Sequence, residues 1–180
     1  MLDLEIIGDE MLIGIISDSH GEVMRTRCAM KLLALSGCEK YIHLGDVETV
    51  EVLDELKGFD VALVFGNCDW GNQLYEHAIN IGIDVREKAD ILRAGKKQIA
   101  FLHGHDERKY YEFLEDGVDY LLHGHTHEKR DEMVNKTRCI NPGALHRADV
   151  YTVAVLDTSH DSVLFLEVDT YDENEPKQHR

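Results

Sequence analysis

Short apolar runs that are each followed at once by a polar, glycine-bearing segment constrain the fold of this 180-residue chain most strongly. Five such runs occupy residues 12–16, 41–44, 61–65, 99–102 and 120–122. Continuous apolar runs of this length are typical of strands that are buried on both faces. We therefore expect a sheet that is covered on both sides, with polar residues gathered where its strands end.

Segments of helical character lie at residues 22–35, 48–56 and 107–114. The predicted apolar stripe of the first segment consists of Met24, Cys28, Leu32 and Leu35. The alternation of strands and helices predicts an α/β domain with a mostly parallel sheet.

Three later stretches are typical of β-hairpins, because in each of them two strand-like runs flank a turn. They cover residues 91–102, 129–140 and 151–168. We expect this antiparallel material to form a second sheet that packs on the first.

The length fits one domain, which we place at residues 11–170. Residues 1–10 are expected to be an N-terminal extension or the product of an upstream start, and the sequence does not decide between them. The polar residues 171–180 are expected to be a flexible tail.

The charge balance limits the classes of partner. There are 35 acidic residues against 19 Lys and Arg, a formal net charge of −16. This composition argues against non-specific nucleic-acid binding and against an anionic membrane surface, both of which attract basic patches. No apolar run approaches the roughly 20 residues that span a bilayer. The acidic start does not resemble a signal peptide, and the four cysteines form no CxxC pair, so a cytoplasmic protein is expected.

Metal-binding side chains occur in the segments that follow the predicted strands. They are Asp18, His20, Asp46, Asn67, His103, His125 and His127. In open α/β sheets, ligands bind beyond the carboxyl ends of the strands, which is where these side chains are expected. Residues two apart on an extended chain point the same way, so Asp18 with His20, and His125 with His127, can each converge on one point. Each motif alone is typical of an ordinary turn, but five of them at strand ends in one chain indicate a metal site.

The ordered motifs resemble those of one family. Asp18-Ser19-His20, Gly45-Asp46, Gly66-Asn67-Cys68-Asp69, His103-Gly104-His105 and Gly124-His125-Thr126-His127 are similar to the calcineurin-like metallophosphoesterase superfamily. Within it, the chain most resembles the small branch of YfcE-type phosphodiesterases. The resemblance implies a four-layer α/β/β/α sandwich of two mixed sheets flanked by helices.

The resemblance also implies how the ligands are divided. Asp18, His20 and His127 would bind one divalent metal ion, while Asn67, His103 and His125 would bind a second. Asp46 would bridge the two ions. The implied reaction is hydrolysis of a P–O bond in a small phosphate ester, by in-line attack of a hydroxide that bridges two metals. The resemblance implies Mn²⁺, and the mixed ligands also suit Fe²⁺, Zn²⁺, Co²⁺ or Ni²⁺.

The sequence leaves more than one possible role for several residues near the predicted metal ligands. The expected catalytic residues are Asp46, Asn67, Cys68 and His103. Cys68 stands where larger relatives carry a His, so it either contacts substrate beside Asn67 or fills space. Arg147 either binds a phosphate oxygen or forms an exposed salt bridge. Asp69 is expected to orient a neighbour through a hydrogen bond.

Two alternatives to an enzyme remain at this stage. One is a non-catalytic scaffold, for which a retromer subunit that resembles the family is the precedent. The other is a small-molecule-binding regulator without turnover. Seven competent ligands favour the enzyme. The sequence carries no base-stacking or sugar-specific signature that identifies a substrate, and the second sheet offers an edge or face for a homodimer.

Overall fold

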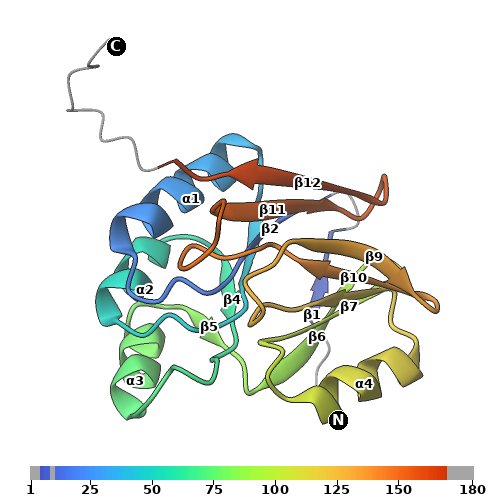
Figure 1. The fold of residues 1–180 in the computed structure, drawn as a ribbon, viewed down its shortest axis with the longest axis horizontal. Coiled ribbons are helices and arrows are strands. Elements are labelled where there is room, and N and C mark those ends of the chain that lie inside the picture. The colour runs from blue at the N-terminus through green and yellow to red at the C-terminus, as the bar shows by residue number, and fades with distance from the viewer. Residues whose placement is uncertain (1–4, 9–10, 170–180) are drawn as a thin grey trace.

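The computed structural model describes residues 5–8 and 11–169, and the strands within them form two six-stranded sheets (Figure 1). The first sheet has the order β12-β11-β2-β3-β4-β5. Its strands are β12 (Ser162–Glu167), β11 (Thr152–Asp157), β2 (Leu12–Ile16), β3 (Lys40–His43), β4 (Val61–Leu63) and β5 (Asp84–Val85). The strands from β2 to β5 are parallel, and β11 and β12 extend the sheet as an antiparallel hairpin.

The second sheet has the order β1-β6-β7-β8-β10-β9. Its strands are β1 (Glu5–Ile7), β6 (Ala89–Ala94), β7 (Lys97–Leu102), β8 (Tyr120–Leu122), β10 (Thr137–Asn141) and β9 (Arg130–Val134). The sheet is mixed: β7, β8 and β10 are parallel, while β6–β7 and β9–β10 are antiparallel hairpins.

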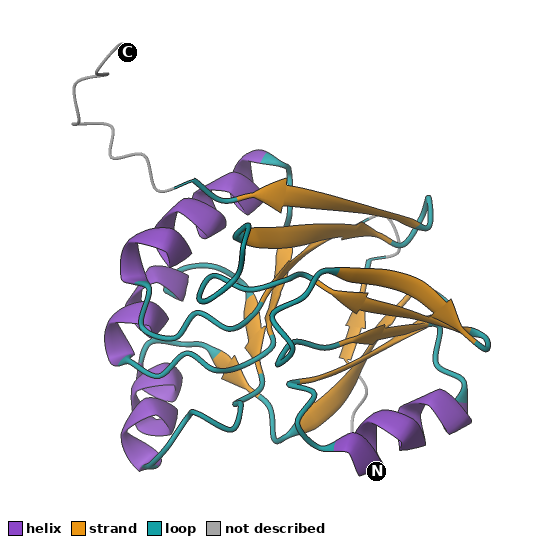
Figure 2. Ribbon diagram, viewed as in Figure 1, coloured by secondary structure: helices purple, strands orange, loops and turns teal. Residues whose placement is uncertain are grey.

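Helices cover the outer face of each sheet (Figure 2). Three of them, α1 (Val23–Leu35), α2 (Val50–Leu56) and α3 (Asn72–Asn80), lie on the first sheet, and α4 (Glu107–Asp116) lies on the second. This confirms the predicted four-layer α/β/β/α sandwich of two mixed sheets. No helix in residues 5–8 and 11–169 is long and apolar enough to cross a membrane.

Alternation along each central strand divides its side chains between two cores. Ile13 and Ile15 of β2 lie in the core between the sheets, whereas Ile16 packs under the helices of the first sheet. In β7, Phe101 faces the same inter-sheet core and Ala100 faces α4. Both faces of the strands are buried, which is why the sequence runs are continuously apolar rather than alternating.

Two sequence predictions are wrong in detail. The face of α1 that is fully buried consists of Thr26, Ala29, Met30 and Leu33. Cys28 and Leu32 pack at the margin of that core, but Met24 and Leu35 are exposed. The helix is therefore rotated so that a mixed set of small and large side chains, rather than the predicted stripe, faces the sheet. The hairpin of residues 151–168 joins the first sheet beside β2 instead of the second, because Val153 and Val155 then pack against the α1 layer.

The segment that precedes Met11 contributes strand β1, which pairs in parallel with β6 at the edge of the second sheet. Glu5 of this strand bonds the buried ammonium of Lys40 at 2.8 Å and also contacts Arg86. The proposed domain limits remain a prediction, and residues 171–180 lie outside the described part of the chain.

Candidate metal centre

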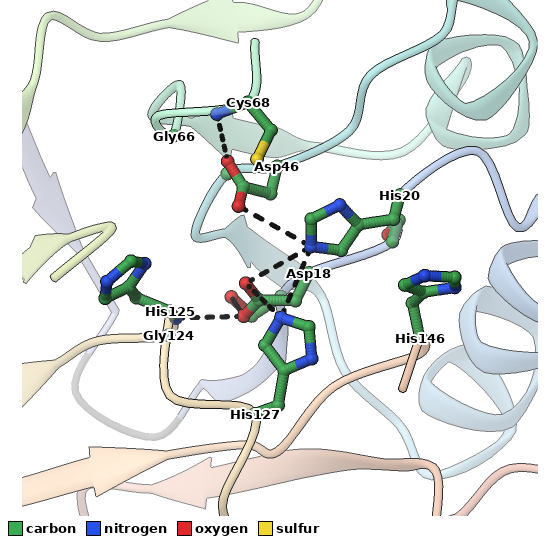
Figure 3. A network of polar contacts seen from close by, with 12 residues as sticks. Asp18, His20, Asp46, Gly66, Cys68, Gly124, His125, His127 and His146 are labelled. Carbon is green, nitrogen blue, oxygen red and sulfur yellow. Dashed lines mark hydrogen bonds and ion pairs between the residues drawn. The ribbon is translucent and has the colours of Figure 1, made fainter. Parts of the chain in front are cut away.

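The five polar segments meet at one end of the sandwich, where the carboxyl ends of β2, β3 and β4 face those of β7 and β8. Figure 3 shows Asp18, His20, Asp46 and His127 pointing toward a common space. The structure therefore brings together side chains that lie up to 109 positions apart, from Asp18 to His127.

Asp18, His20 and His127 form the first cluster. The Oδ1 atom of Asp18 lies 3.3 Å from Nε2 of His127 and 3.9 Å from Nε2 of His20. The two Nε2 atoms are 3.3 Å apart. Ligand atoms about 2.1 Å from one ion lie about 3.0–3.4 Å from one another at octahedral or tetrahedral angles. The two spacings of 3.3 Å fit a shared cation, and the third, of 3.9 Å, is longer than this range.

The second cluster consists of Asp46, Asn67, His103 and His125. Nε2 of His103 lies 3.1 Å from Oδ1 of Asn67 and 3.2 Å from Oδ2 of Asp46. A ring nitrogen of His125 lies within 4.8 Å of ligand atoms of Asp46 and His103. The same Oδ2 atom of Asp46 is 3.5 Å from Nε2 of His20 in the first cluster. Asp46 thus lies between the clusters, as a bridging ligand would.

One buried atom tests whether a cation fits. Oδ1 of Asp18 is buried and has no hydrogen-bond partner among the described residues, while its Oδ2 accepts from Ser17 and from the backbone N–H of His125. An unpaired buried carboxylate oxygen is costly. A metal ion bound between Asp18, His20 and His127 would satisfy this atom, and the mixed oxygen and nitrogen donors suit a transition metal.

The backbone at the site is held in an unusual conformation. Five of the predicted ligands have left-handed φ values, namely Asp18 (53°), His20 (40°), Asp46 (56°), His125 (69°) and His127 (61°). Each such residue costs on the order of 1 kcal/mol and persists only where its surroundings impose it. Concentration of this strain on the ligands indicates that the loops are shaped for the site.

Two glycines allow the loops to approach each other. A Cβ atom on Gly66 would lie 2.1 Å from Oδ1 of Asp46, and one on Gly124 would lie 1.9 Å from the Ser17 hydroxyl and 2.6 Å from Oδ2 of Asp18. Any side chain at these positions would therefore displace a carboxylate of the site.

The carboxylate of Asp69 organises the loop after β3. It accepts hydrogen bonds of 2.8 Å from the backbone N–H groups of Asp46, Val47, Glu48 and Gly66. This confirms the predicted orienting role of Asp69. Since the loop after β4 thereby holds the loop after β3, the ligands Asn67 and Asp46 are placed together.

The Nδ1 atoms of two candidate ligands, His20 and His103, also have hydrogen-bond partners. Nδ1 of His20 lies 2.7 Å from the carboxylate of Glu48, and Nδ1 of His103 lies 2.8 Å from the carbonyl oxygen of Leu44. Such partners place the proton on Nδ1 and leave Nε2 free to bind a metal. The sequence prediction missed Glu48, which was assigned to a helix that in fact begins at Val50. The sequence signal that could have identified Glu48 is its position two residues after the candidate ligand Asp46.

The pKa values of the Asp46 and Asp18 carboxyl groups agree with a bound cation. Burial by itself would raise the pKa of Asp46, but the neighbouring imidazole of His103 and a hydrogen bond from the Cys68 backbone lower it well below its usual range. Burial also opposes the lowered pKa of Asp18, which results from the nearby rings of His127 and His103 and from the hydrogen bond of Ser17. Both carboxyls are therefore ionised and available as ligands.

A cavity of about 360 Å³ opens over the ligands. Its walls include Cys68, His146 and Arg147. Burial and the neighbouring Asp46 raise the pKa of the Cys68 thiol to about 11, so the thiol is protonated near neutral pH. Arg147 is exposed, with φ of 45°, and forms no ion pair within the described ranges. The ring of His146, which the sequence did not single out, lies 5.1 Å from that of His20 and is held by Glu22 at 2.9 Å.

Comparison with known proteins agrees with this geometry. A family model described as "Calcineurin-like phosphoesterase superfamily domain" matches residues 11–161. The chain is similar to Phosphodiesterase MJ0936 of Methanocaldococcus jannaschii, with 28% identity over 82% of this chain and 93% of that protein.

Two solved structures are similar in fold. One, described as a novel archaeal phosphodiesterase, has a TM-score of 0.80 and 25% identity over 88% of this chain and all of that chain. The other is Vps29 of Entamoeba histolytica complexed with zinc, with a TM-score of 0.61 and 20% identity over 89% of this chain and all of that chain. The second likeness extends to the fold alone.

Proposed function

Because the chain belongs to the calcineurin-like phosphoesterase superfamily, we propose that it is a binuclear, metal-dependent phosphodiesterase. The observation that carries the proposal is the position of Oδ2 of Asp46, which is 3.5 Å from His20 Nε2 and 3.2 Å from His103 Nε2. This oxygen faces one histidine of each cluster, so it is placed to bridge a pair of adjacent cations.

The seven side chains would hold the ions as the family pattern implies. Asp18, His20 and His127 would bind the first ion, Asn67, His103 and His125 the second, and Asp46 both. Two such ions lower the pKa of a water molecule and stabilise charge on the phosphate. We propose Mn²⁺ as the ion in the cell, with Fe²⁺, Zn²⁺, Co²⁺ and Ni²⁺ as competent substitutes.

In the reaction a water molecule adds to phosphorus, in line with the ester oxygen that leaves. One P–O bond breaks, and the products are a phosphomonoester and an alcohol. Asn67 and His103 would hold the second ion, and the two ions would offset the charge of the phosphate beside Asp46. Cys68, whose backbone N–H bonds Asp46 at 2.8 Å, lines the cavity with a protonated thiol, and Arg147, which also lines it, would bind a phosphate oxygen.

Other features support the rest of the assignment. The four cysteines of the chain are all free in the structure, which fits a reducing compartment, and we propose a cytoplasmic location. The small cavity and the acidic surface support a small phosphate ester as substrate rather than a nucleic-acid polymer. A homodimer formed through a sheet edge remains part of the proposal.

A scaffold role is not favoured by any particular observation, because each of the seven ligand positions carries a donor and all of them converge. The test is hydrolysis of bis-p-nitrophenyl phosphate by wild type and by Asp46→Asn, with and without added Mn²⁺. We expect Mn²⁺-dependent activity in wild type and a loss of at least about 100-fold in the variant.

Asp54→Asn is the matched control, because Asp54 is a half-exposed residue of α2 that pairs with His77 away from the cavity. Chelation should abolish wild-type activity, and Mn²⁺ should restore it. Equal rates for wild type and Asp46→Asn, or no hydrolysis with any of the five metals, would contradict the proposed function.

A further inference from the structure

A second cavity, of about 660 Å³, is lined in part by residues that follow β4 and β7, as the candidate ligands Asn67 and His103 do. It opens between α3, α4 and the segment that joins β5 to β6. Its lining consists of Phe65, Tyr75, Val85, Arg86, Glu87, Lys88, Ala89, Asp106 and Lys109. Nothing in the metal chemistry requires this cavity.

Chain connectivity ties this cavity to the metal centre. Phe65 precedes the ligand Asn67 by two residues, so their Cα atoms are at most about 7 Å apart. Asp106 follows His105, whose ring centroid lies 5.5 Å from that of His103 and 6.3 Å from that of His125. A substrate whose phosphate lies on the ligands can therefore extend one of its ester arms into the second cavity.

The lining of the cavity suits a planar, partly apolar group. Phe65 and Tyr75 supply two aromatic rings, and Val85 and Ala89 supply aliphatic surface. Tyr75 is 52% exposed although it is a large aromatic residue, and it lies on α3 where its ring is accessible. Aromatic side chains at the mouth of a cavity are good surfaces on which a base can stack.

The cavity also holds one cation without an ion pair. Arg86 pairs with Glu5, Asp84 and Asp90, and Lys109 pairs with Glu112. Lys88 forms no ion pair with any described residue, so its ammonium is free to meet an anion. An anionic ester with an aromatic arm matches the aromatic rings and this free ammonium.

We propose that this cavity binds the nucleoside arm of the substrate, with the base stacked on Tyr75, so that the preferred substrates are small nucleotide diesters. This inference rests on the proposed phosphodiesterase function and adds the substrate class to it. The metal cavity of about 360 Å³ holds the phosphate and the leaving arm.

Two chromogenic diesters test the proposal. Thymidine 5′-(p-nitrophenyl phosphate) and methyl p-nitrophenyl phosphate release the same group, so the ratio of their kcat/KM values isolates the arm that differs. In Tyr75→Ala this ratio should fall about tenfold, within the range that loss of one stacking ring produces. Tyr75→Phe keeps the ring and should retain the wild-type ratio.

Tyr111→Ala is the matched control, because Tyr111 is a 59% exposed tyrosine of α4 that does not line the cavity. It should leave the hydrolysis of both esters unchanged. Calorimetric titration of the Mn²⁺-loaded protein with thymidine 5′-monophosphate and with methyl phosphate measures the same preference without turnover. Wild type should bind the nucleotide at least about tenfold more tightly, and Tyr75→Ala should lose most of that difference.

The outcomes separate the two proposals. If no diester is hydrolysed, the phosphodiesterase proposal fails, whereas the titrations still report on the cavity. If diesters are hydrolysed but Tyr75→Ala retains both the wild-type ratio and the wild-type difference in affinity, the nucleoside assignment is overturned.

Discussion

Replacing Asp69 with asparagine should destabilise the protein far more than so small a change suggests. The two carboxylate oxygens of Asp69 share four backbone donors, two on each oxygen, all at 2.8 Å. An asparagine in either orientation presents its NH₂ group to two of these N–H donors. Burial raises the pKa of Asp69, so the carboxylate depends on all four donors to offset its lost hydration.

The magnitude follows from the two bonds that are lost. A hydrogen bond to a charged group contributes about 1.5–3 kcal/mol, so two contribute about 3–6 kcal/mol. We expect about 3 kcal/mol, the lower end, because Asp69 is only partly buried. For a protein of this length that corresponds to a fall in Tm of about 6–12 °C.

Thermal and urea unfolding, followed by circular dichroism, measure this loss. Asp157→Asn is the control, because Oδ1 of Asp157 alone accepts from the backbone N–H groups of Ser159 and His160, and an amide oxygen can replace it. It should cost less than about 1 kcal/mol. If Asp69→Asn were no more destabilising than Asp157→Asn, the loop after β3 would not depend on this carboxylate, and the reasoning would be refuted.

Two further predictions concern polar contacts that support the fold and the site. Glu48→Ala removes the carboxylate that orients His20, so Mn²⁺ affinity measured by calorimetry should weaken about 10–100-fold, and unchanged affinity would show that His20 is positioned without it. Lys40→Met should lower the free energy of unfolding by about 1–3 kcal/mol at pH 7, because Lys40 is 1% exposed and bonds Glu5 and Asp60. Burial by itself would lower the pKa of Lys40, but the carboxylates of Glu5 and Asp60 raise it. The contribution of Lys40 to the free energy of unfolding is therefore complete below the unfolded pKa of about 10.4, and it is lost as the pH rises through the higher pKa of the folded protein. The difference between wild type and Lys40→Met should therefore shrink above about pH 10.5, and a constant difference up to pH 11 would contradict this account.

The sequence was informative where local chemistry and strand order agree. Continuous apolar runs predict strands that are buried on both faces, and the two sheets covered by helices have such strands. The polar residues after those runs predict ligands at strand ends, because parallel strands present their carboxyl ends at one edge. Asp18, Asp46 and His103 lie there as expected.

The sequence was less informative about which face of a helix is buried and which sheet a hairpin joins. Helical periodicity places Met24 and Leu35 on a stripe with Leu32, yet α1 buries Ala29 and Thr26 instead. Periodicity leaves more than one stripe of the helix available, and contacts with the sheet decide which of them is buried. Similarly, a hairpin pattern indicates which two strands pair with each other but not which sheet they join.

By itself, the sequence determined the motif set, the family and the edge of the sandwich at which the ligands gather, since these follow from residue type and local order. The tertiary structure alone decided that Oδ2 of Asp46 faces both clusters, that Asp69 and Glu48 support the ligands, and that Phe65 and Tyr75 line a common cavity. These features arise from contacts between loops of different strands, and the distances of such contacts depend on how two sheets pack, which no local pattern in the chain encodes.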